Sequence, residues 1–367
     1  MVNAEEILYS IALRRSPLVG DVTFANLVGE VGSAKEVWSL SQSELRKISG
    51  IGKQIASSIG DKNLLKLAEK EIEFCIKNEI KIHLRHLNQL PRLLGECYDA
   101  PVILFQKGDY DDTANNISIV GTRNATAYGK SFLEDLIVQF KDKNIQVISG
   151  LALGTDGIAH QEALKNNIKT SAVLAHGLHI VYPSKHKILA EEILRDGGAL
   201  FSEFCSDEKP DREHFLQRNR IVAGLSANTI VVESAYAGGS ISTASFANQY
   251  NREVYALAGR LTDKYSQGCN HLIFQNKAKI ISSIKGLLKD LDLDNTSKVL
   301  EFFPLVDVAL TPVQKPIYDA IKGGNDISLD DLSEKLNQPI SKVFPVLLEL
   351  ELLGLIRANS GRKYSII

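Results

Sequence analysis

The chain has 367 residues, enough for roughly two or three domains with a sizeable core. Apolar residues make up 44% and charged residues 23%, which is ordinary for a soluble globular protein. The formal net charge of −2 excludes a basic excess over the whole chain, so any nucleic-acid site must be a local patch. No apolar run is long enough to span a bilayer, and the four scattered cysteines lack a CxxC pair. We therefore expect a cytoplasmic protein with reduced thiols, no membrane contact and no zinc site.

Residues 1–80 have the pattern of short helices and are predicted to form one small domain. Around Gly50 a helix, a Gly-Ile-Gly turn and a second helix follow one another, which is typical of a helix-hairpin-helix motif. Its glycines would let the backbone approach a phosphate, at which the second helix would aim N–H groups. Because Lys47 and Lys53 are the only nearby cations, a turn that merely connects two packed helices explains the pattern equally well.

Residues 81–290 alternate between short apolar runs and helix-length segments. This alternation predicts a parallel sheet that is covered by helices on both faces. The segments Ile82–Leu84 and Val102–Phe105 are predicted to add two strands to that sheet. The predicted strands of the alternating region are Ile117–Val120, Gln146–Ser149, Ser171–Ala175, Ala199–Ser202, Thr229–Glu233 and Val254–Ala258.

Glycine-bearing loops join three of these strands to the helices that follow them. Parallel strands end at the same edge of a sheet, where ligands bind, and each helix start offers unpaired N–H groups. Three such loops, one with an arginine, predict a site for a phosphate-bearing ligand, although tight strand-to-helix turns alone would also use glycine. The loops are Gly121-Thr122-Arg123, Gly150-Leu-Ala-Leu-Gly154-Thr155-Asp156 and Ala237-Gly238-Gly239-Ser240.

The segment 211–224 is predicted to be a helix that carries a nucleic-acid-binding stripe. Arg212, Phe215 and Asn219 follow one another at i, i+3 and i+7. A cation holds a phosphate and an aromatic ring stacks on a base of any identity, which is what a single strand requires. The alternative is that Phe215 belongs to the core.

Two further arginines of this segment are candidate ligands of the same site. Helical spacing places Arg218 near the buried face of the helix and Arg220 on the opposite face. For Arg218 a structural role is equally plausible, in which it braces the sheet edge through backbone carbonyls or Glu233.

Catalytic patterns are missing from the sequence. It has no HExxH pair, no GxSxG elbow and no GxxxxGK[ST] loop, so we expect no catalytic residue, no metal and no cofactor. Asp156 lies at a helix start, where a cap is its usual role. Glu203 and Glu233 end strands at the ligand edge and could act as bases or orient an arginine.

Residues 291–311 are predicted to be a linker, and residues 312–367 a winged-helix domain with three helices and a hairpin. The predicted helices are Val313–Ile321, Ser328–Leu336, which opens with a Ser N-cap, and Ser341–Leu353, and the hairpin turns around Ser360-Gly361.

The third of these helices lacks the composition of a groove-reading helix. It carries Lys342 against Glu349 and Glu351, whereas a reading helix should be basic or rich in amides. The wing supplies the cations Arg357, Arg362 and Lys363. We therefore expect this domain to contact protein, or phosphate weakly, without reading sequence.

A series of motifs resembles the DprA/Smf (DNA processing protein A) family, in the family's order and over nearly the whole chain. The motifs are Ser118-Ile-Val-Gly-Thr-Arg123, Ser149-Gly-Leu-Ala-Leu-Gly-Thr-Asp156 with Ala159-His160, Gly177-Leu-His-Ile-Val-Tyr-Pro183, Gly198-Ala-Leu-Phe-Ser-Glu-Phe204, Arg218-Asn-Arg-Ile-Val-Ala-Gly-Leu-Ser226, Val231-Val-Glu-Ser234, Gly239-Ser240 with Thr243-Ala244, and Gly268-Cys-Asn-His-Leu-Ile273.

The resemblance implies an α/β fold: an extended Rossmann-like parallel-sheet domain flanked by a helix-hairpin-helix (SAM-like) domain and a winged-helix domain. It also implies a non-enzymatic homodimer that binds incoming single-stranded DNA in natural transformation, protects it and loads the RecA recombinase onto it. The family's basic DNA pocket maps onto Arg123, Arg218 and Arg220. Leu153 stands where the family commonly has an arginine, which weakens the phosphate contact expected from that loop.

A nucleotide phosphoribohydrolase of a related Rossmann group is the alternative. Such enzymes carry a Gly-Gly-x-Gly-Thr-x-x-Glu loop. Aligned from Gly238-Gly239, this chain has Ile241, Ser242 and Ser245 in place of the third glycine, the threonine and the glutamate. The catalytic carboxylate is therefore missing, and the enzyme interpretation is disfavoured.

Overall fold

The computed structural model describes residues 4–293, 310–322, 327–353, 355–359 and 363–366. The chain divides into two compact units, Met1–Asp294 and Asn295–Ile367. Among the described residues, no helix is both long enough and apolar enough to cross a membrane.

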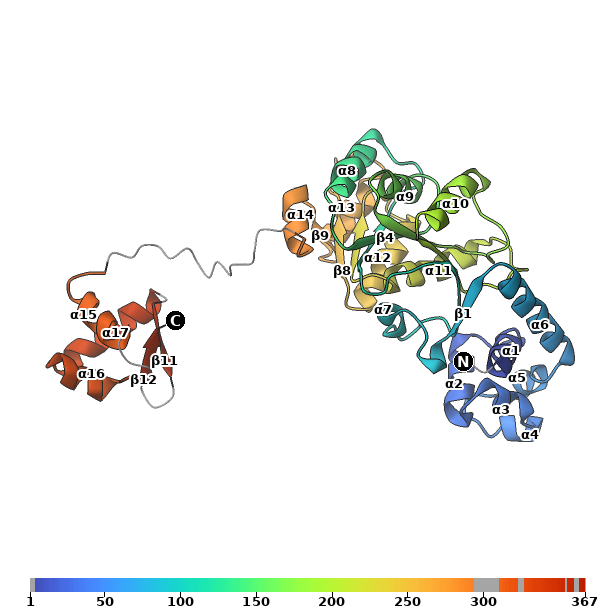
Figure 1. Ribbon diagram of the computed structural model, residues 1–367, viewed down its shortest axis with the longest axis horizontal. Helices are drawn as coiled ribbons and strands as arrows, with labels where there is room; N and C mark the ends of the chain where they lie inside the picture. Colours follow the sequence, from blue (N-terminus) through green and yellow to red (C-terminus); the bar gives the residue numbers. More distant parts are fainter. Residues whose placement is uncertain (1–3, 294–309, 323–326, 354, 360–362, 367) are drawn as a thin grey trace. The chain divides into compact units, whose positions relative to one another are not determined.

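Short helices open the first unit (Figure 1). Gly50, with φ +79°, lies in the turn between two of them, as the Gly-Ile-Gly pattern predicts. Their apolar side chains form a core that continues onto the first two strands through Ile80, Leu84 and Phe105. These helices and the sheet therefore share buried contacts, and the boundary at residue 80 stays a proposal. The helices are α1 (Ala4–Arg14), α2 (Asp21–Val31), α3 (Ala34–Ser39), α4 (Gln42–Leu45), α5 (Lys53–Ser58) and α6 (Lys62–Lys77).

A sheet forms the centre of the first unit, with the strand order β1-β2-β6-β5-β4-β3-β7-β8-β9 among the described residues. In this order, the seven strands β6-β5-β4-β3-β7-β8-β9 pair in parallel. Strands β1 and β2 extend the sheet by antiparallel pairing. The predicted parallel sheet and its two additional strands are therefore confirmed. The strands are β1 (Ile80–Leu84), β2 (Ile103–Gly108), β3 (Asn115–Val120), β4 (Ile145–Ser149), β5 (Lys169–Val173), β6 (Ala199–Ser202), β7 (Asn228–Val231), β8 (Glu253–Ala256) and β9 (Lys279–Ile280).

Helices cover both faces of this sheet through separate apolar cores, as predicted (Figure 1). The apolar face of α8, formed by Phe132, Leu133, Leu136 and Ile137, is buried. Because helices lie on both sides, a strand such as β4 is buried along its whole length. Its two polar side chains, Gln146 and Ser149, donate hydrogen bonds to the hydroxyl of Ser171 and to the carbonyl of Ile119. One face carries α8 (Ala127–Val138), α9 (Thr155–Lys165), α10 (Lys187–Arg195) and α14 (Ile284–Asp290), and the other α7 (Arg92–Gly95), α11 (Arg212–Gly224), α12 (Gly239–Gln249) and α13 (Gln267–Phe274).

The second unit has the winged-helix layout that the sequence predicts. The hydroxyl of Ser328 accepts a hydrogen bond from the backbone N–H of Asp331 at 3.1 Å, so the predicted N-cap is present. Its strands pair antiparallel in the order β10-β12-β11. The elements are α15 (Gln314–Lys322), β10 (Ile327–Ser328), α16 (Leu329–Leu336), α17 (Ile340–Leu352), β11 (Ile356–Asn359) and β12 (Lys363–Ile366).

Several predictions fall partly on residues outside the described ranges. The predicted turn around Ser360-Gly361 and the wing cation Arg362 lie there, as do residues 294–309 of the predicted linker. At the start of that linker, Leu291 is buried and Leu293 partly buried in the core that α8 and α14 share.

Candidate functional site

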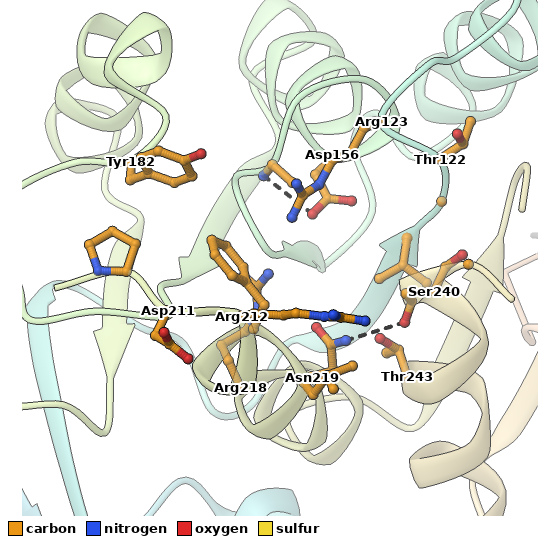
Figure 2. Close-up of a pocket in the computed structure, with 18 of the residues that line it drawn as sticks. Thr122, Arg123, Asp156, Tyr182, Asp211, Arg212, Arg218, Asn219, Ser240 and Thr243 are labelled. Atoms are coloured by element: carbon orange, nitrogen blue, oxygen red, sulfur yellow. Dashed lines mark hydrogen bonds between the residues drawn. The ribbon is translucent and has the colours of Figure 1, made fainter.

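A pocket with a volume of about 1140 Å³ opens at the carboxyl edge of the parallel strands (Figure 2). The loop after β3, the start of α11 and the start of α12 form its walls. Most of the predicted site residues meet in this pocket although they are up to 119 positions apart in the chain (121 to 240). They are Gly121, Thr122, Arg123, Arg212, Phe215, Arg218, Asn219, Gly238, Gly239 and Ser240.

Gly154 and Thr155 lie behind the pocket wall instead of facing the cavity. The backbone N–H of Thr155 donates to the carbonyl of Thr122 at 3.0 Å. Gly154 has φ +76°, and a Cβ at this position would lie 2.4 Å from the same carbonyl. Only glycine allows this close approach, so the loop after β4 supports the loop that carries Arg123.

Arg123 and Phe215 supply an exposed cation next to an aromatic ring. The guanidinium carbon of Arg123 lies 5.2 Å from the centre of the Phe215 ring. Phe215 lines the pocket and is only partly buried, so it is not a core residue. The ring therefore has a cation beside it, but this cation is Arg123 from the β3 loop, whereas the sequence paired Phe215 with Arg212 on the same helix.

Arg218 is buried below this pair. It donates hydrogen bonds to the carbonyls of Gly150 and Val173, which is the bracing role that the sequence left open. Burial lowers the pKa of Arg218 to about 10, against the attraction of Asp156. Burial raises the pKa of Asp156, whose carboxylate accepts from the N–H groups of Gly150 and Ala152. Arg218 thus fixes the sheet edge and also forms part of the pocket wall.

Arg220 lies outside the pocket. The prediction placed it on the face opposite the buried one, but this side of α11 is covered as well, and Arg220 is only 6% exposed. Its guanidinium pairs with Asp21 at 3.0 Å and with Glu203, and it donates to the carbonyl of Asp99. Burial raises the pKa of Glu203 to about 7 although Arg220 opposes this shift. Glu203 therefore orients an arginine, one of its two predicted roles.

The start of α12 supplies backbone groups to the opposite wall. No side chain caps this helix at Gly238, so its first N–H groups remain available to an anion. Asn219 donates from its side-chain amide to the carbonyl of Gly239 at 3.2 Å and ties α11 to this loop. The hydroxyl of Ser240 donates to that of Ser234 at 2.8 Å.

The remaining acidic candidate and a buried histidine have structural partners. Glu233 accepts from the backbone N–H and the hydroxyl of Thr126, at 2.8 and 2.6 Å, at the start of α8. His160 is buried against the hydroxyl of Thr170, and burial lowers its pKa to about 3. In the described part of the chain, no group of three or more His, Cys, Asp or Glu side chains is arranged to hold a metal ion.

Sequence reasoning missed several pocket residues, notably Tyr182, Lys209 and Thr243. Tyr182 lies in the motif Gly177–Pro183 and Thr243 in the motif that follows Gly239-Ser240, and both motifs were recognised without a role for these residues. Lys209 lies in a loop and carries no periodic signal.

The parallel sheet with cation-bearing loops at its carboxyl edge defines a Rossmann-like α/β protein. Residues 81–292 match the family described as DNA recombination-mediator protein A, and residues 304–362 match the DprA winged helix domain. The chain therefore belongs to the DprA/Smf family, whose members act in DNA processing and recombination.

Relatives and solved structures agree with this assignment. Protein Smf of Synechocystis is 30% identical over 400 residues, which cover 99% of each chain. DprA of Streptococcus pneumoniae is 39% identical over 200 residues, 54% of this chain and 70% of its own. The X-ray structure of the S. pneumoniae protein matches with a TM-score of 0.65 at 29% identity, over 79% of this chain and 99% of its own.

A structure of DprA from Helicobacter pylori matches with a TM-score of 0.53 at 29% identity, over 59% of this chain and 97% of its own. It is described as giving insight into the single-stranded DNA binding mode of that protein.

Proposed function

We propose that this protein binds single-stranded DNA in the pocket at the carboxyl edge of its sheet. The observation that carries the proposal is the exposed guanidinium of Arg123 next to the partly exposed ring of Phe215, opposite the uncapped start of α12. Cations and helix starts bind phosphates, and a ring stacks on a base of any identity. A paired duplex keeps its bases stacked inside, so this combination favours a single strand.

The residues divide into direct contacts and supports. Arg123, Arg212, Phe215 and the loop Gly238–Ser240 would touch the strand. Arg218 and Asn219 would hold the walls, and also contact the strand where they line the cavity. Gly154, Thr155 and Arg220 would act only through the elements that they fix.

We further propose the role that family membership suggests. The protein would bind incoming single strands in the cytoplasm during natural transformation, protect them, and load the RecA recombinase onto them as a homodimer without catalysing a reaction. In this proposal residues 81–290 form the DNA-binding domain. Residues 1–80 form a flanking helix-hairpin-helix domain, and residues 312–367 form a flanking winged-helix domain that follows the 291–311 linker. The named H. pylori structure supports the single-strand part of the proposal.

The test compares Arg123→Ala with Arg195→Ala, a control on α10 whose side chain is 69% exposed and pairs with Glu192 and Asp196. We expect Arg123→Ala to weaken binding of oligo-dT and of a mixed-sequence oligonucleotide by about tenfold each, and to lower the salt slope by about one. Unchanged affinity would show that the pocket is not the binding site.

Recombinase loading has a separate test. The wild-type protein should shorten the lag before RecA hydrolyses ATP on single strands coated with a single-strand-binding protein, and Arg123→Ala should lengthen that lag again. A wild-type protein that binds single strands and leaves the lag unchanged would remove the loading role and keep the binding role.

A further inference from the structure

The motif Gly177–Pro183 brings a second aromatic ring to the pocket. Tyr182 lines the cavity, and its ring centre lies 5.9 Å from that of Phe215 with an angle of 57° between the planes. The Tyr182 side chain is 46% exposed. Figure 2 shows it on the side of the pocket that faces Ser240 and Thr243 across the cavity. A large ring left open to solvent inside a concave site is positioned for contact with a ligand.

The backbone under Tyr182 is held by buried contacts. A Cβ at Gly177 would lie 2.1 Å from the carbonyl oxygen of Cys205, so the chain passes where only glycine fits. The N–H of Gly177 donates to the carbonyl of Glu208 at 3.0 Å. The loop that leads to Tyr182 is therefore anchored at its first residue.

His176 anchors the same loop at its far end. Its Nδ1 lies 2.9 Å from the carbonyl oxygen of Gly177 and donates there, which leaves Nε2 to accept from the backbone N–H of Tyr182 at 3.2 Å. Burial lowers the pKa of His176, and the neutral ring is the form that both hydrogen bonds require. Tyr182 is thus presented from a fixed backbone, so little ordering entropy is lost when a ligand binds.

We infer that Tyr182 is a second base-stacking residue of this site, which acts beside Phe215 on the neighbouring base of the same strand. Because the two rings are tilted, one base cannot lie flat on both, and each ring takes its own base. Arg123 and the start of α12 would hold the phosphates around these two bases. The inference rests on the proposed function and names the residue that extends its contact to a second base.

The test separates stacking from phosphate contact. Binding of oligo-dT and of an abasic oligonucleotide of equal length is measured by fluorescence anisotropy for the wild type, Tyr182→Leu and Tyr182→Phe. Tyr182→Leu should weaken oligo-dT binding by about tenfold and leave binding of the abasic strand unchanged, since no base is left to stack. Tyr182→Phe should bind both like the wild type. Arg123→Ala should weaken both.

Tyr98→Leu is the matched control, because Tyr98 is 65% exposed and lies outside the pocket lining. It should bind both oligonucleotides like the wild type. A second measurement uses the unaltered protein: light-induced crosslinking to an oligonucleotide with 5-iodouracil should attach to the peptide that contains Tyr182.

Two results would overturn the inference. One is Tyr182→Leu binding oligo-dT as tightly as the wild type, with no crosslink at Tyr182. The other is an equal loss on oligo-dT and the abasic strand, which would mean that Tyr182 only shapes the pocket. A wild-type protein that binds no single strand at all would sink the proposed function itself, a different outcome from either of these.

Discussion

The sheet-edge pocket and helix α17 offer a nucleic acid very different surfaces. The pocket places Arg123, Arg212 and Lys209 around a partly exposed ring. On α17 the side chains of Ile340, Phe344 and Leu348 are each more than 40% exposed.

The acidic groups of α17 are already used within its own unit. Glu349 accepts from the side-chain amide of Gln314, and Glu351 accepts from the backbone N–H of Ala358. A winged-helix layout therefore does not by itself make a DNA-reading surface, whereas the Rossmann-like edge has both the cations and the ring. The fold sets the positions of the side chains, and the residues at those positions set the chemistry.

The largest effect is expected where the pocket depends on a buried charge. Arg218→Met removes the donor to the carbonyls of Gly150 and Val173 and leaves Asp156 without its cation. We expect the first unit to lose about 3 kcal/mol of unfolding free energy, measured by urea unfolding followed by circular dichroism. The exposed Arg212→Met should change it by less than about 0.5 kcal/mol. Equal urea midpoints for both variants would contradict the bracing role.

Gly154→Ala tests the support behind Arg123. The positive φ and the 2.4 Å approach to the carbonyl of Thr122 should make this change cost about 2 kcal/mol and weaken oligo-dT binding, because the Arg123 loop must move. In Gly29→Ala, on helix α2, a Cβ meets nothing within 4 Å, so this variant should be at least as stable as the wild type. Thermal unfolding in parallel compares the two, and similar losses would show that the pocket edge is not tightly packed.

His160, a buried residue of α9, should make the stability of the first unit depend on pH. Burial holds the pKa of His160 at about 3 in the folded state, below the ordinary 6.5. The contribution of the neutral ring to the unfolding free energy is therefore fully present above pH 6.5 and is lost as the pH falls toward 3. At pH 5 the loss should be about 2 kcal/mol. His160→Gln should lose less stability than the wild type between pH 7 and pH 5 in urea titrations. Parallel losses in the two proteins would show that His160 is not the titrating group.

The smallest effect is expected on α17. Lys342→Ala should change the affinity for oligo-dT by less than twofold, because the sequence of α17 supplies no second Lys or Arg and does carry Glu349 and Glu351. A tenfold loss in the same anisotropy assay would mean that the second unit binds the strand, and the contrast between the two regions would fail.

The sheet, its strand segments and the meeting of the glycine loops were predictable from the sequence. Alternation of apolar runs with helix-length segments sets the topology, and parallel strands bring their carboxyl ends together. The sequence analysis expected a cation beside Phe215 but took it from Arg212 of the same helix, whereas Arg123 of the loop after β3 lies over the ring.

The partners of individual side chains were not predictable. Spacing along α11 cannot show that α2 covers Arg220, because that contact joins residues 199 positions apart. Nor can it show that Gly154 and Thr155 stand behind Thr122, or that Tyr182 reaches Phe215. Such contacts depend on three-dimensional packing between segments whose sequences carry no mutual signal.

The most direct test of the pocket is fluorescence anisotropy of labelled oligo-dT and of a labelled duplex, titrated with protein at two salt concentrations. We expect tighter binding of oligo-dT than of the duplex, with an affinity that falls steeply as salt rises. Equal or tighter duplex binding, or single-strand binding that ignores salt, would contradict the assignment of phosphate and base contacts to this site.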